Sequence, residues 1–154
     1  MLNRLVAFIL DEQRYALPLK SVQRVARMVE VTPLPKAPDI VLGVIALQGN
    51  IIPVMSMRRR FGLPEPETRL TDQLVVVETA TRSIALVVNS VAGVVECTGE
   101  QIIEIEKIAP GTQYVEGVTK LEDDILFIHN VDRFLSKKED QQLDGLLAQA
   151  AGGE

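Results

Sequence analysis

The chain has 154 residues, of which 47% are apolar and 24% are charged, and this composition is typical of a folded globular protein rather than a disordered one. Its net charge of −5 argues against general nucleic-acid binding, which needs a basic surface. A single cysteine, Cys97, excludes an internal disulfide, and with the single histidine, His129, it also excludes the usual Cys/His zinc sites. No apolar run approaches the roughly 20 residues that a membrane-spanning helix requires.

Short apolar or alternating segments, separated by polar turns, predict β-strands through the first half of the chain. The expected strands are 5–10, 14–19, a turn and strand within 21–32, then 43–47 and 51–57, with hairpin turns at 11–13 and 48–50. Pro33, Pro35 and Pro38 indicate an irregular crossing segment, and a helical turn is expected over 57–61. The Pro- and Glu-rich segment 63–72 is expected to be a connector.

The second half predicts the same kinds of element. Strands are expected over 73–78, 83–88, 94–98, 102–105, 117–121 and 125–130. Beyond Asp132, the helical spacing of Leu143, Leu146, Leu147 and Ala150 predicts a C-terminal helix. This helix either packs against the body of the protein or binds a partner.

The two halves form a weak internal repeat, with copies over about 4–61 and 73–135. Segment 43–52 aligns with 117–126, and segment 15–22 aligns with 84–91 in the same order along the chain. Two copies of about five strands predict an all-β fold of two small barrels that share a core and leave a groove between them. The predicted domain covers 1–136, and a helical tail covers 137–154.

Motifs for catalysis are missing from the sequence: it has no phosphate-binding glycine loop, no HExxH and no GxSxG. His129 lies in an apolar run and is expected to be a core residue rather than a catalytic base. Cys97 is expected to be a packing residue rather than a nucleophile. Glu104 and Glu106 share one strand face, as an acid pair or as solvated groups. The three arginines at 58–60 are either exposed to solvent or part of a surface for an anionic partner. Because no catalytic motif is present, the sequence favours a binding module over an enzyme.

Several segments, taken in order, carry a family resemblance that no single motif would. They are YALPL at 15–19 followed by Val22 and Val25, PLPKAPDIVLGVIALQGNIIPV at 33–54, RRRFGLP at 58–64, IALVVNSV at 84–91 with VVE at 94–96, and ILFIHNVDRFL at 125–135. This ordered set resembles the CheW family, the adaptor proteins of bacterial chemosensory systems. The resemblance covers roughly 4–136, which is nearly the whole chain.

The resemblance implies two SH3-like five-stranded β-barrels with a C-terminal helix, no catalysis and no cofactor or metal. It implies a cytoplasmic adaptor, recruited to membrane-associated receptor arrays, that couples chemoreceptor signalling tips to the histidine kinase CheA. Receptor tips would dock in the groove between the barrels, and the kinase's regulatory domain would pair with barrel ends. The free protein is expected to be a monomer that neither binds nucleic acid nor inserts into a membrane.

The positions that match the family's receptor-contacting region are Val22, Arg24, Gly43, Gln48 and Val95. Arg24 stands where the family has an acid and Gln48 where it has an arginine, so the opposite charges that could pair there are missing. These departures leave an alternative open, a CheW-like regulator of a non-flagellar pathway without ordinary receptor coupling. Gly43 is expected to allow a close backbone approach. Val22→Asp or Gly43→Asp is predicted to weaken receptor binding without unfolding the chain.

An enzyme of another class remains a third hypothesis, with Cys97 or the pair Glu104 and Glu106 at its centre. That hypothesis requires a polar pocket that converges on these residues. The adaptor hypotheses require an aliphatic groove instead.

Overall fold

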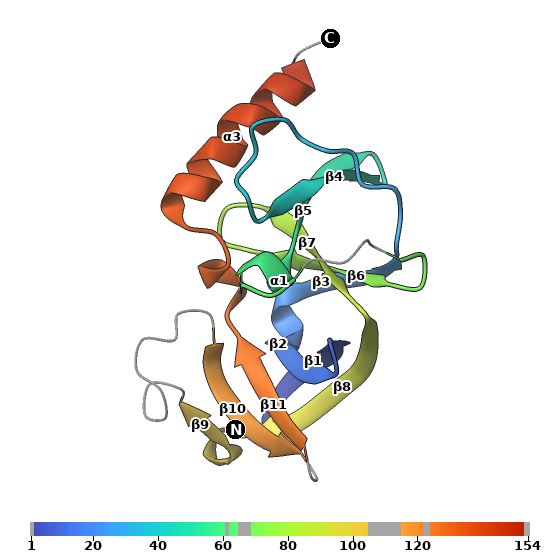
Figure 1. Cartoon of the computed structure of the whole chain (residues 1–154). Coiled ribbons are helices and arrows are strands. Elements are labelled where there is room, and N and C mark those ends of the chain that lie inside the picture. Colours follow the sequence, from blue (N-terminus) through green and yellow to red (C-terminus); the bar gives the residue numbers. More distant parts are fainter. Residues whose placement is uncertain (1, 61, 65–68, 105–114, 122–123, 153–154) are drawn as a thin grey trace.

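The computed structural model describes residues 2–60, 62–64, 69–104, 115–121 and 124–152, and it shows two β-sheets with one long helix beside them (Figure 1). We name the two sheets barrel I and barrel II. Barrel I contains β1 (Leu2–Leu10), β2 (Gln13–Pro18), β8 (Ser90–Thr98), β9 (Ile102–Glu104), β10 (Val115–Leu121) and β11 (Asp124–His129). Barrel II contains β3 (Val22–Arg27), β4 (Val41–Leu47), β5 (Asn50–Met55), β6 (Gln73–Glu78) and β7 (Ser83–Val88). The helical elements are η1 (Leu19–Ser21), α1 (Met57–Arg60), η2 (Gly99–Gln101), η3 (Val131–Arg133) and α3 (Lys137–Gly152).

The internal repeat is visible in the strand pairing, but the two copies exchange their first hairpins. In barrel I the hairpin β1–β2 lies between β8 and β11, and in barrel II the hairpin β6–β7 lies between β3 and β5. The register shift at Val41/Gly43 in β4 recurs at Val115/Gly117 in β10, at the positions that the sequence repeat makes equivalent. Each barrel therefore takes strands from both copies, which corrects the expectation that 4–61 and 73–135 each form one barrel.

The exchange follows from two short connections. The chain passes from β2 to β3 through the single 3-10 turn η1, and from β7 to β8 through Asn89 alone. A reversal into an adjacent antiparallel strand needs a hairpin loop of at least about two residues. Asn89 cannot provide that loop, and its backbone N–H instead donates to the carbonyl of Ile9 in barrel I at 2.9 Å. Strand β8 thus enters barrel I rather than pairing with β7, and the three residues of η1 lead the chain from β2 into barrel II.

The largest hydrophobic cluster joins the two barrels. It contains Phe8 and Leu17 from barrel I, Met55 and Leu86 from barrel II, and Leu143 from α3, all 1% exposed or less. A smaller cluster fills the interior of each barrel. The shared core expected from the sequence is present. It explains how barrels too small to bury much surface alone form a stable unit.

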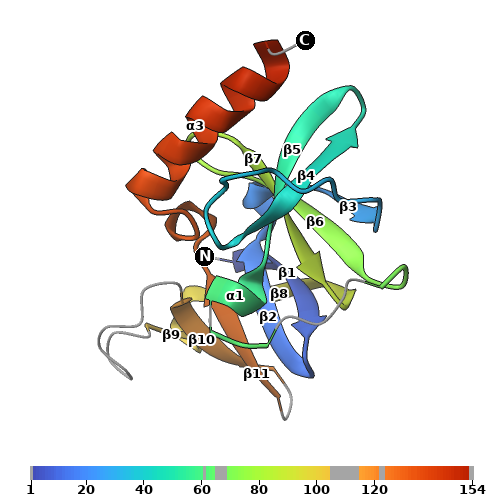
Figure 2. The ribbon, with the colours of Figure 1, turned by 45° about the horizontal axis from the view of Figure 1, so that its top comes forward.

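Helix α3 lies along barrel II and away from β9, β10 and β11 in both views (Figure 1 and Figure 2). A capping box begins it, because the Ser136 N–H donates to Glu139 Oε1 at 2.8 Å and the Glu139 N–H donates to Ser136 Oγ at 3.1 Å. Arg60 of α1 donates to the same Glu139 oxygen at 2.6 Å. α3 begins at Lys137, where the predicted tail begins, although its treatment as a unit separate from 1–136 remains a prediction.

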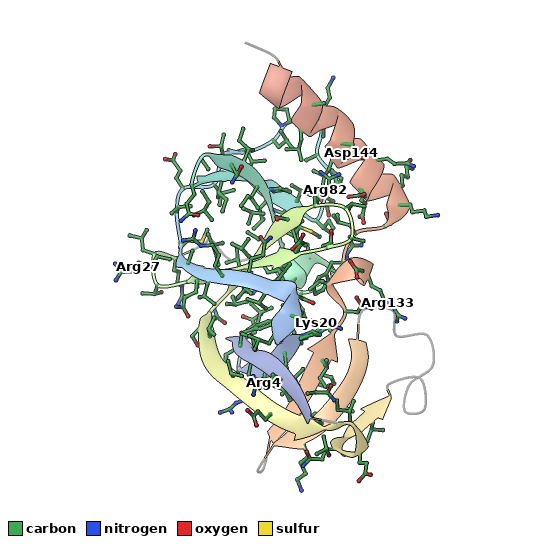
Figure 3. The ribbon with its side chains drawn as sticks, turned by 180° about the vertical axis from the view of Figure 1, so that it is seen from behind. Arg4, Lys20, Arg27, Arg82, Arg133 and Asp144 are labelled. Carbon is green, nitrogen blue, oxygen red and sulfur yellow. The ribbon has the colours of Figure 1, made fainter. Side chains whose placement is uncertain are left out.

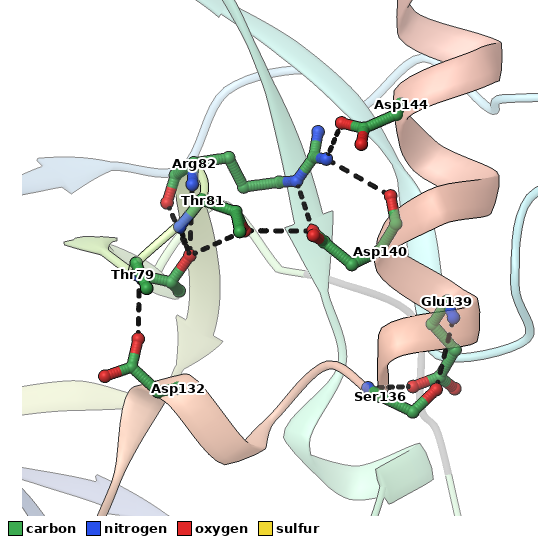
Figure 4. A network of polar contacts seen from close by, with 9 residues as sticks. Thr79, Thr81, Arg82, Asp132, Ser136, Glu139, Asp140 and Asp144 are labelled. Carbon is green, nitrogen blue, oxygen red and sulfur yellow. Dashed lines mark hydrogen bonds and ion pairs between the residues drawn. The ribbon is translucent and has the colours of Figure 1, made fainter.

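A second polar network joins α3 to the β6–β7 turn (Figure 4). Arg82 Nε donates to Asp140 Oδ1 at 2.7 Å, and Arg82 Nη2 donates to Asp144. In the same turn the Ala80 N–H donates to Asp132 Oδ1 at 2.7 Å, which ties η3 to barrel II. Burial alone would lower the pKa of Arg82, but its hydrogen bonds to Asp140 and Asp144 outweigh burial and raise the pKa. The C-terminal helix therefore packs on the body through Leu143 and through ion pairs on both sides of that residue.

Docking of α3 is predicted to weaken in acid. Burial raises the pKa of Glu139, but hydrogen bonds from the Ser136 N–H and from Arg60 outweigh it and hold the pKa below the ordinary value of 4.5. A carboxyl with a lowered folded pKa stabilises the fold above its unfolded pKa, and this stabilisation is lost as the pH falls through the folded value. Glu139→Gln is expected to cost about 1–2 kcal/mol at neutral pH.

Urea unfolding followed by circular dichroism, at pH values from about 7 down to about 3, measures this effect. The wild-type free energy of unfolding should fall more steeply below pH 4.5 than that of Glu139→Gln. Some acid loss remains in the variant, because the Arg58 guanidinium also holds the pKa of Asp11 below its usual value. Parallel curves for the two proteins would contradict the assignment to Glu139.

Candidate partner-binding site

The structure places two of the five predicted site residues, Arg24 and Gln48, in one pocket of about 440 Å³ on barrel II. Strand β3 contributes Arg24, which is half-buried and lies opposite Val76 just after a register shift in the β3–β6 pairing. The turn between β4 and β5 contributes Gln48. Its φ of 50°, followed by 82° at Gly49, is the left-handed pair that a tight hairpin turn requires. The lining also includes Gln23, Leu47, Asn50, Ile51, Ile52, Pro53, Val76, Arg82, Ser83 and Leu147.

Neither Arg24 nor Gln48 makes a side-chain hydrogen bond or an ion pair within the described residues. Arg82, the other cation of the pocket lining, is occupied by Asp140 and Asp144 of α3. Asn50, also in the lining, makes no side-chain hydrogen bond within the described residues either, so the pocket presents one cation and two amides for an external partner.

The other predicted site residues lie outside this pocket. Val22 is half-buried at the start of β3 and packs against the cluster shared by the two barrels. Val95 lies on β8 opposite Leu5 and packs against the interior cluster of barrel I. The described structure thus brings Arg24 and Gln48 together, and it spreads Val22, Gly43 and Val95 over β3, β4 and β8.

Gly43 does permit a close backbone approach, but the neighbour is the chain's own Thr32. Thr32 and Val44 exchange backbone hydrogen bonds of 2.9 and 2.8 Å. A Cβ atom at position 43 would lie 2.3 Å from the Thr32 carbonyl oxygen. At Gly117, its equivalent in the second copy, an added Cβ would lie 2.8 Å from the Ile102 side chain and 3.1 Å from the Ile103 carbonyl oxygen of β9, which is a looser contact. The glycine at this repeated position therefore serves packing within the chain.

The other ten residues of the pocket lining were not predicted as site residues from the sequence. Leu147 belongs to the predicted helical stripe, but its position beside Arg24 and Gln48 depends on where α3 docks. Arg82 and Ser83 come from the β6–β7 hairpin, which reaches barrel II only because the copies exchange hairpins. Ile51 could have been identified from the sequence as a candidate surface residue, because it is an apolar residue immediately after the predicted hairpin turn at 48–50.

The residues considered for catalysis do not form a reaction centre in the described chain. His129 is fully buried, with its ring 5.1 Å from that of Tyr15 and 5.7 Å from that of Phe134, as expected of a core histidine. Cys97 is buried in barrel I, and burial raises the pKa of its thiol, which disfavours the reactive thiolate. The side chain of Glu104 and the whole of Glu106 lie outside the described residues. No three potential metal ligands cluster in the part of the chain that the structure describes.

Arg58 and Arg60 of the arginine cluster 58–60 are used inside the protein, contrary to both sequence interpretations, whereas Arg59 is exposed, as one of them expected. Arg58 is buried and donates to both carboxylate oxygens of Asp11 at 2.8 and 2.9 Å. Arg60 pairs with Glu139, and Arg59 donates to the Asp39 carbonyl at 2.8 Å. The cluster therefore ties α1 to the β1–β2 turn, to α3 and to the crossing segment.

Exposed aliphatic side chains recur at equivalent positions of the two barrels. Val25 on β3 is 40% exposed, and Val94 on β8 is 58% exposed. These two valines are equivalent when the alignment of 15–22 with 84–91 is continued along the chain. Ile51 on β5 and Ile125 on β11, equivalent in the alignment of 43–52 with 117–126, are 51% and 56% exposed. Each barrel therefore presents two exposed aliphatic side chains at repeat-equivalent positions, an arrangement suited to protein contacts.

Two small β-barrels that share a core and carry exposed aliphatic side chains at repeat-equivalent positions define a tandem SH3-like protein. A model of the CheW-like domain family matches residues 4–139. The chain belongs to the CheW-like domain family. No helix in the described part of the chain is long and apolar enough to span a membrane.

Curated and solved relatives agree with this assignment. Chemotaxis protein CheW of Treponema pallidum is 26% identical over 93% of this chain and 88% of that protein. Chemotaxis protein CheW of Klebsiella aerogenes is 26% identical over 90% of this chain and 85% of that protein. The crystal structure of scaffolding protein TtCheW from Thermoanaerobacter tengcongensis has a TM-score of 0.81, with 27% identity over 90% of this chain and 96% of that one. The expected family and the expected fold, two SH3-like barrels with a C-terminal helix, are confirmed.

Proposed function

We propose that this protein is a non-catalytic scaffold of a bacterial chemosensory system that couples chemoreceptor signalling tips to the regulatory domain of the histidine kinase CheA. The observation that carries the proposal is the repeated aliphatic pair, Val25 with Ile51 and Val94 with Ile125. A molecule that joins two kinds of partner needs more than one docking surface, and the duplicated barrel supplies equivalent ones. Its relatives are chemotaxis proteins, which favours this function over the alternative of a non-flagellar regulator.

The receptor contact is proposed at Val22, Arg24, Gly43, Gln48 and Val95. Arg24 and Gln48 are its polar anchors, because they share a pocket and have no internal partner in the described chain. Val22 and Val95 are half-buried and supply aliphatic surface. Gly43 acts indirectly, by holding the crossing segment against β4. Small contacts of this kind are expected to be weak one at a time and to gain strength by avidity in a cytoplasmic array beneath the membrane.

The kinase contact is proposed at the exposed pair Val94 and Ile125 of barrel I. Val94 is 58% exposed on β8 and Ile125 is 56% exposed on β11, so a partner that covers both spans the hairpin β1–β2 that lies between these strands. Val94→Asp combined with Ile125→Asp should lower the affinity for the kinase's regulatory domain at least about tenfold, because each adds a charge to an apolar contact. Isothermal titration calorimetry measures the change. Val29→Asp, at an exposed valine outside both strands, is the matched control.

The test of the whole function is an NMR titration of the labelled protein with two probes in turn. These are the regulatory domain of the kinase and the isolated cytoplasmic signalling tip of a chemoreceptor, both from the same organism. Two separate sets of shifted amides, around Val94 and Ile125 for the kinase and around Arg24 and Gln48 for the receptor, are expected. Chemical-shift changes on addition of the kinase domain but not of the receptor tip would contradict the receptor-coupling role. No chemical-shift change with either probe would contradict the proposed function.

A further inference from the structure

We propose that the pocket formed by Arg24, Gln48 and Leu147 accepts an acidic side chain of the receptor tip, so that this adaptor selects receptors that present a carboxylate at that contact. The inference rests on the proposed function for the identity of the partner. It adds the chemical class of the contacting group and a contribution from α3.

The first step is the charge of the pocket. Two arginines line it, but the guanidinium of Arg82 is bound by Asp140 and Asp144. Arg24 has no acidic partner within the described residues, and it is half-buried. A partly desolvated cation without a counterion favours an incoming anion, and a guanidinium binds a carboxylate with paired hydrogen bonds.

The second step is the state of the neighbouring polar groups. Ser83 Oγ donates to Gln23 Oε1 at 3.0 Å, and Gln23 Nε2 donates to Glu78 at 3.4 Å. These side chains therefore satisfy one another. Gln48 has no such partner in the described chain, and its amide can donate a hydrogen bond beside Arg24. Asn50 of the same hairpin is a second such amide, so Arg24 and an amide of this hairpin form a donor pair for a carboxylate.

The third step is the wall that α3 provides. Leu147 is half-buried, packs against the shared core and lines the pocket with Ile51 of the β4–β5 hairpin. Aliphatic groups beside a charge lower the local dielectric constant and strengthen the pairing of Arg24 with an anion. The bonds from Arg82 to Asp140 and Asp144 hold α3 against the β6–β7 turn (Figure 4), and they thereby fix Leu147 at this position.

The test uses the full chain and the isolated signalling tip of a chemoreceptor from the same organism, with affinities measured by calorimetry. Arg24→Glu is expected to lower the affinity for the tip by about tenfold or more, because it replaces a charge-assisted pair with a repulsion. Arg27→Glu is the matched control. Arg27 lies on the same strand and undergoes the same change of charge, but it is exposed at the far edge of barrel II from Arg82 and lines no part of the pocket (Figure 3).

Two further variants test the wall and the charge of the partner. Leu147→Ala should weaken tip binding severalfold, whereas Leu146→Ala, at the neighbouring half-buried leucine outside the pocket, should not. A tip variant with lysine in place of the contacting acid should recover affinity for Arg24→Glu. The kinase's regulatory domain serves as the second probe, and its affinity should stay unchanged in all of these variants.

The outcomes separate this inference from the proposed function. A wild-type chain that binds the kinase domain but not the receptor tip would overturn both. A wild-type chain that binds the tip, with Arg24→Glu equal to Arg27→Glu or tighter than wild type, would overturn only the acidic specificity. Equal losses from Leu147→Ala and Leu146→Ala would remove α3 from the site.

Discussion

Replacing Gly43 with alanine is expected to lower the free energy of unfolding by about 3 kcal/mol. The added Cβ would lie 2.3 Å from the Thr32 carbonyl oxygen and 2.8 Å from the Thr32 carbonyl carbon and from Val31 Cγ1. Backbone atoms held by the Thr32–Val44 hydrogen bonds cannot move aside as the end of a flexible side chain could. The φ of +155° at Gly43 adds strain that glycine avoids.

Urea unfolding measures this cost, and two other glycines separate its causes. Gly49 has a φ of +82° and open space where a Cβ would lie, so Gly49→Ala carries strain without a clash and should cost about 1 kcal/mol. Gly145 lies in α3 with open space, and Gly145→Ala should stabilise the protein by about 0.5–1 kcal/mol. Equal costs at Gly43 and Gly49 would show that the Thr32 contact is unimportant.

This geometry revises the sequence prediction that Gly43→Asp weakens receptor binding without unfolding the chain. Aspartate adds a larger side chain and a charge where even a methyl group clashes with backbone. Loss of receptor binding by this variant would therefore report damage to barrel II. Arg24→Glu is the better probe of the contact, because Arg24 lies in the pocket and makes no hydrogen bond or ion pair within the described residues.

Leu143→Ala is expected to lower the free energy of unfolding by about 3 kcal/mol and to loosen α3. Leu143 is completely buried in the cluster shared by both barrels, together with Phe134 and Val131. Truncation of Leu143 either leaves a cavity in that cluster or releases α3 from the barrels. If α3 is released, the loss in the free energy of unfolding cannot exceed the free energy with which α3 docks. Leu146→Ala, at a half-buried position on the same helix, should cost about 1 kcal/mol or less.

A double variant distinguishes a cavity from release of the helix. Arg82→Ala alone removes the bonds to Asp140 and Asp144. If Leu143→Ala releases α3, adding Arg82→Ala should cost little more, whereas independent effects should add within about 0.5 kcal/mol. Limited proteolysis within α3 should be faster in either single variant than in wild type. Wild-type stability and wild-type proteolysis of Leu143→Ala would contradict the docking role of this leucine.

Local patterns predicted most of the individual elements. Alternating apolar residues and polar turns located the hairpins β1–β2, β4–β5, β6–β7 and β10–β11, because each depends on neighbours in sequence. The helical spacing around Leu143 located α3 for the same reason. The region 21–32 was less clear, since β3 ends at Arg27 and Thr32 forms only an isolated bridge to Val44.

Features that depend on distant parts of the chain were not predictable from the sequence. The exchange of hairpins between barrels is decided by pairings such as Leu5 with Val95, which no local pattern encodes. The partners of Arg58 and Arg60, Asp11 and Glu139, are 47 and 79 residues away along the chain. Within the candidate site, family resemblance located Arg24 and Gln48, whereas Leu147 required the docked position of α3.

The exchanged hairpins also govern how the protein can form during synthesis. When the first copy leaves the ribosome, β3, β4 and β5 lack the hairpin β6–β7 that separates β3 from β5 in barrel II. Hairpin β1–β2 lacks its neighbouring strands for longer still, because β8 and then β11 are synthesised in the later part of the chain. Barrel II therefore cannot close before β7 has been made, and barrel I cannot close before β11 has been made. A nascent chain of this protein remains without its core for most of its translation, and exposed strands in that interval are open to aggregation.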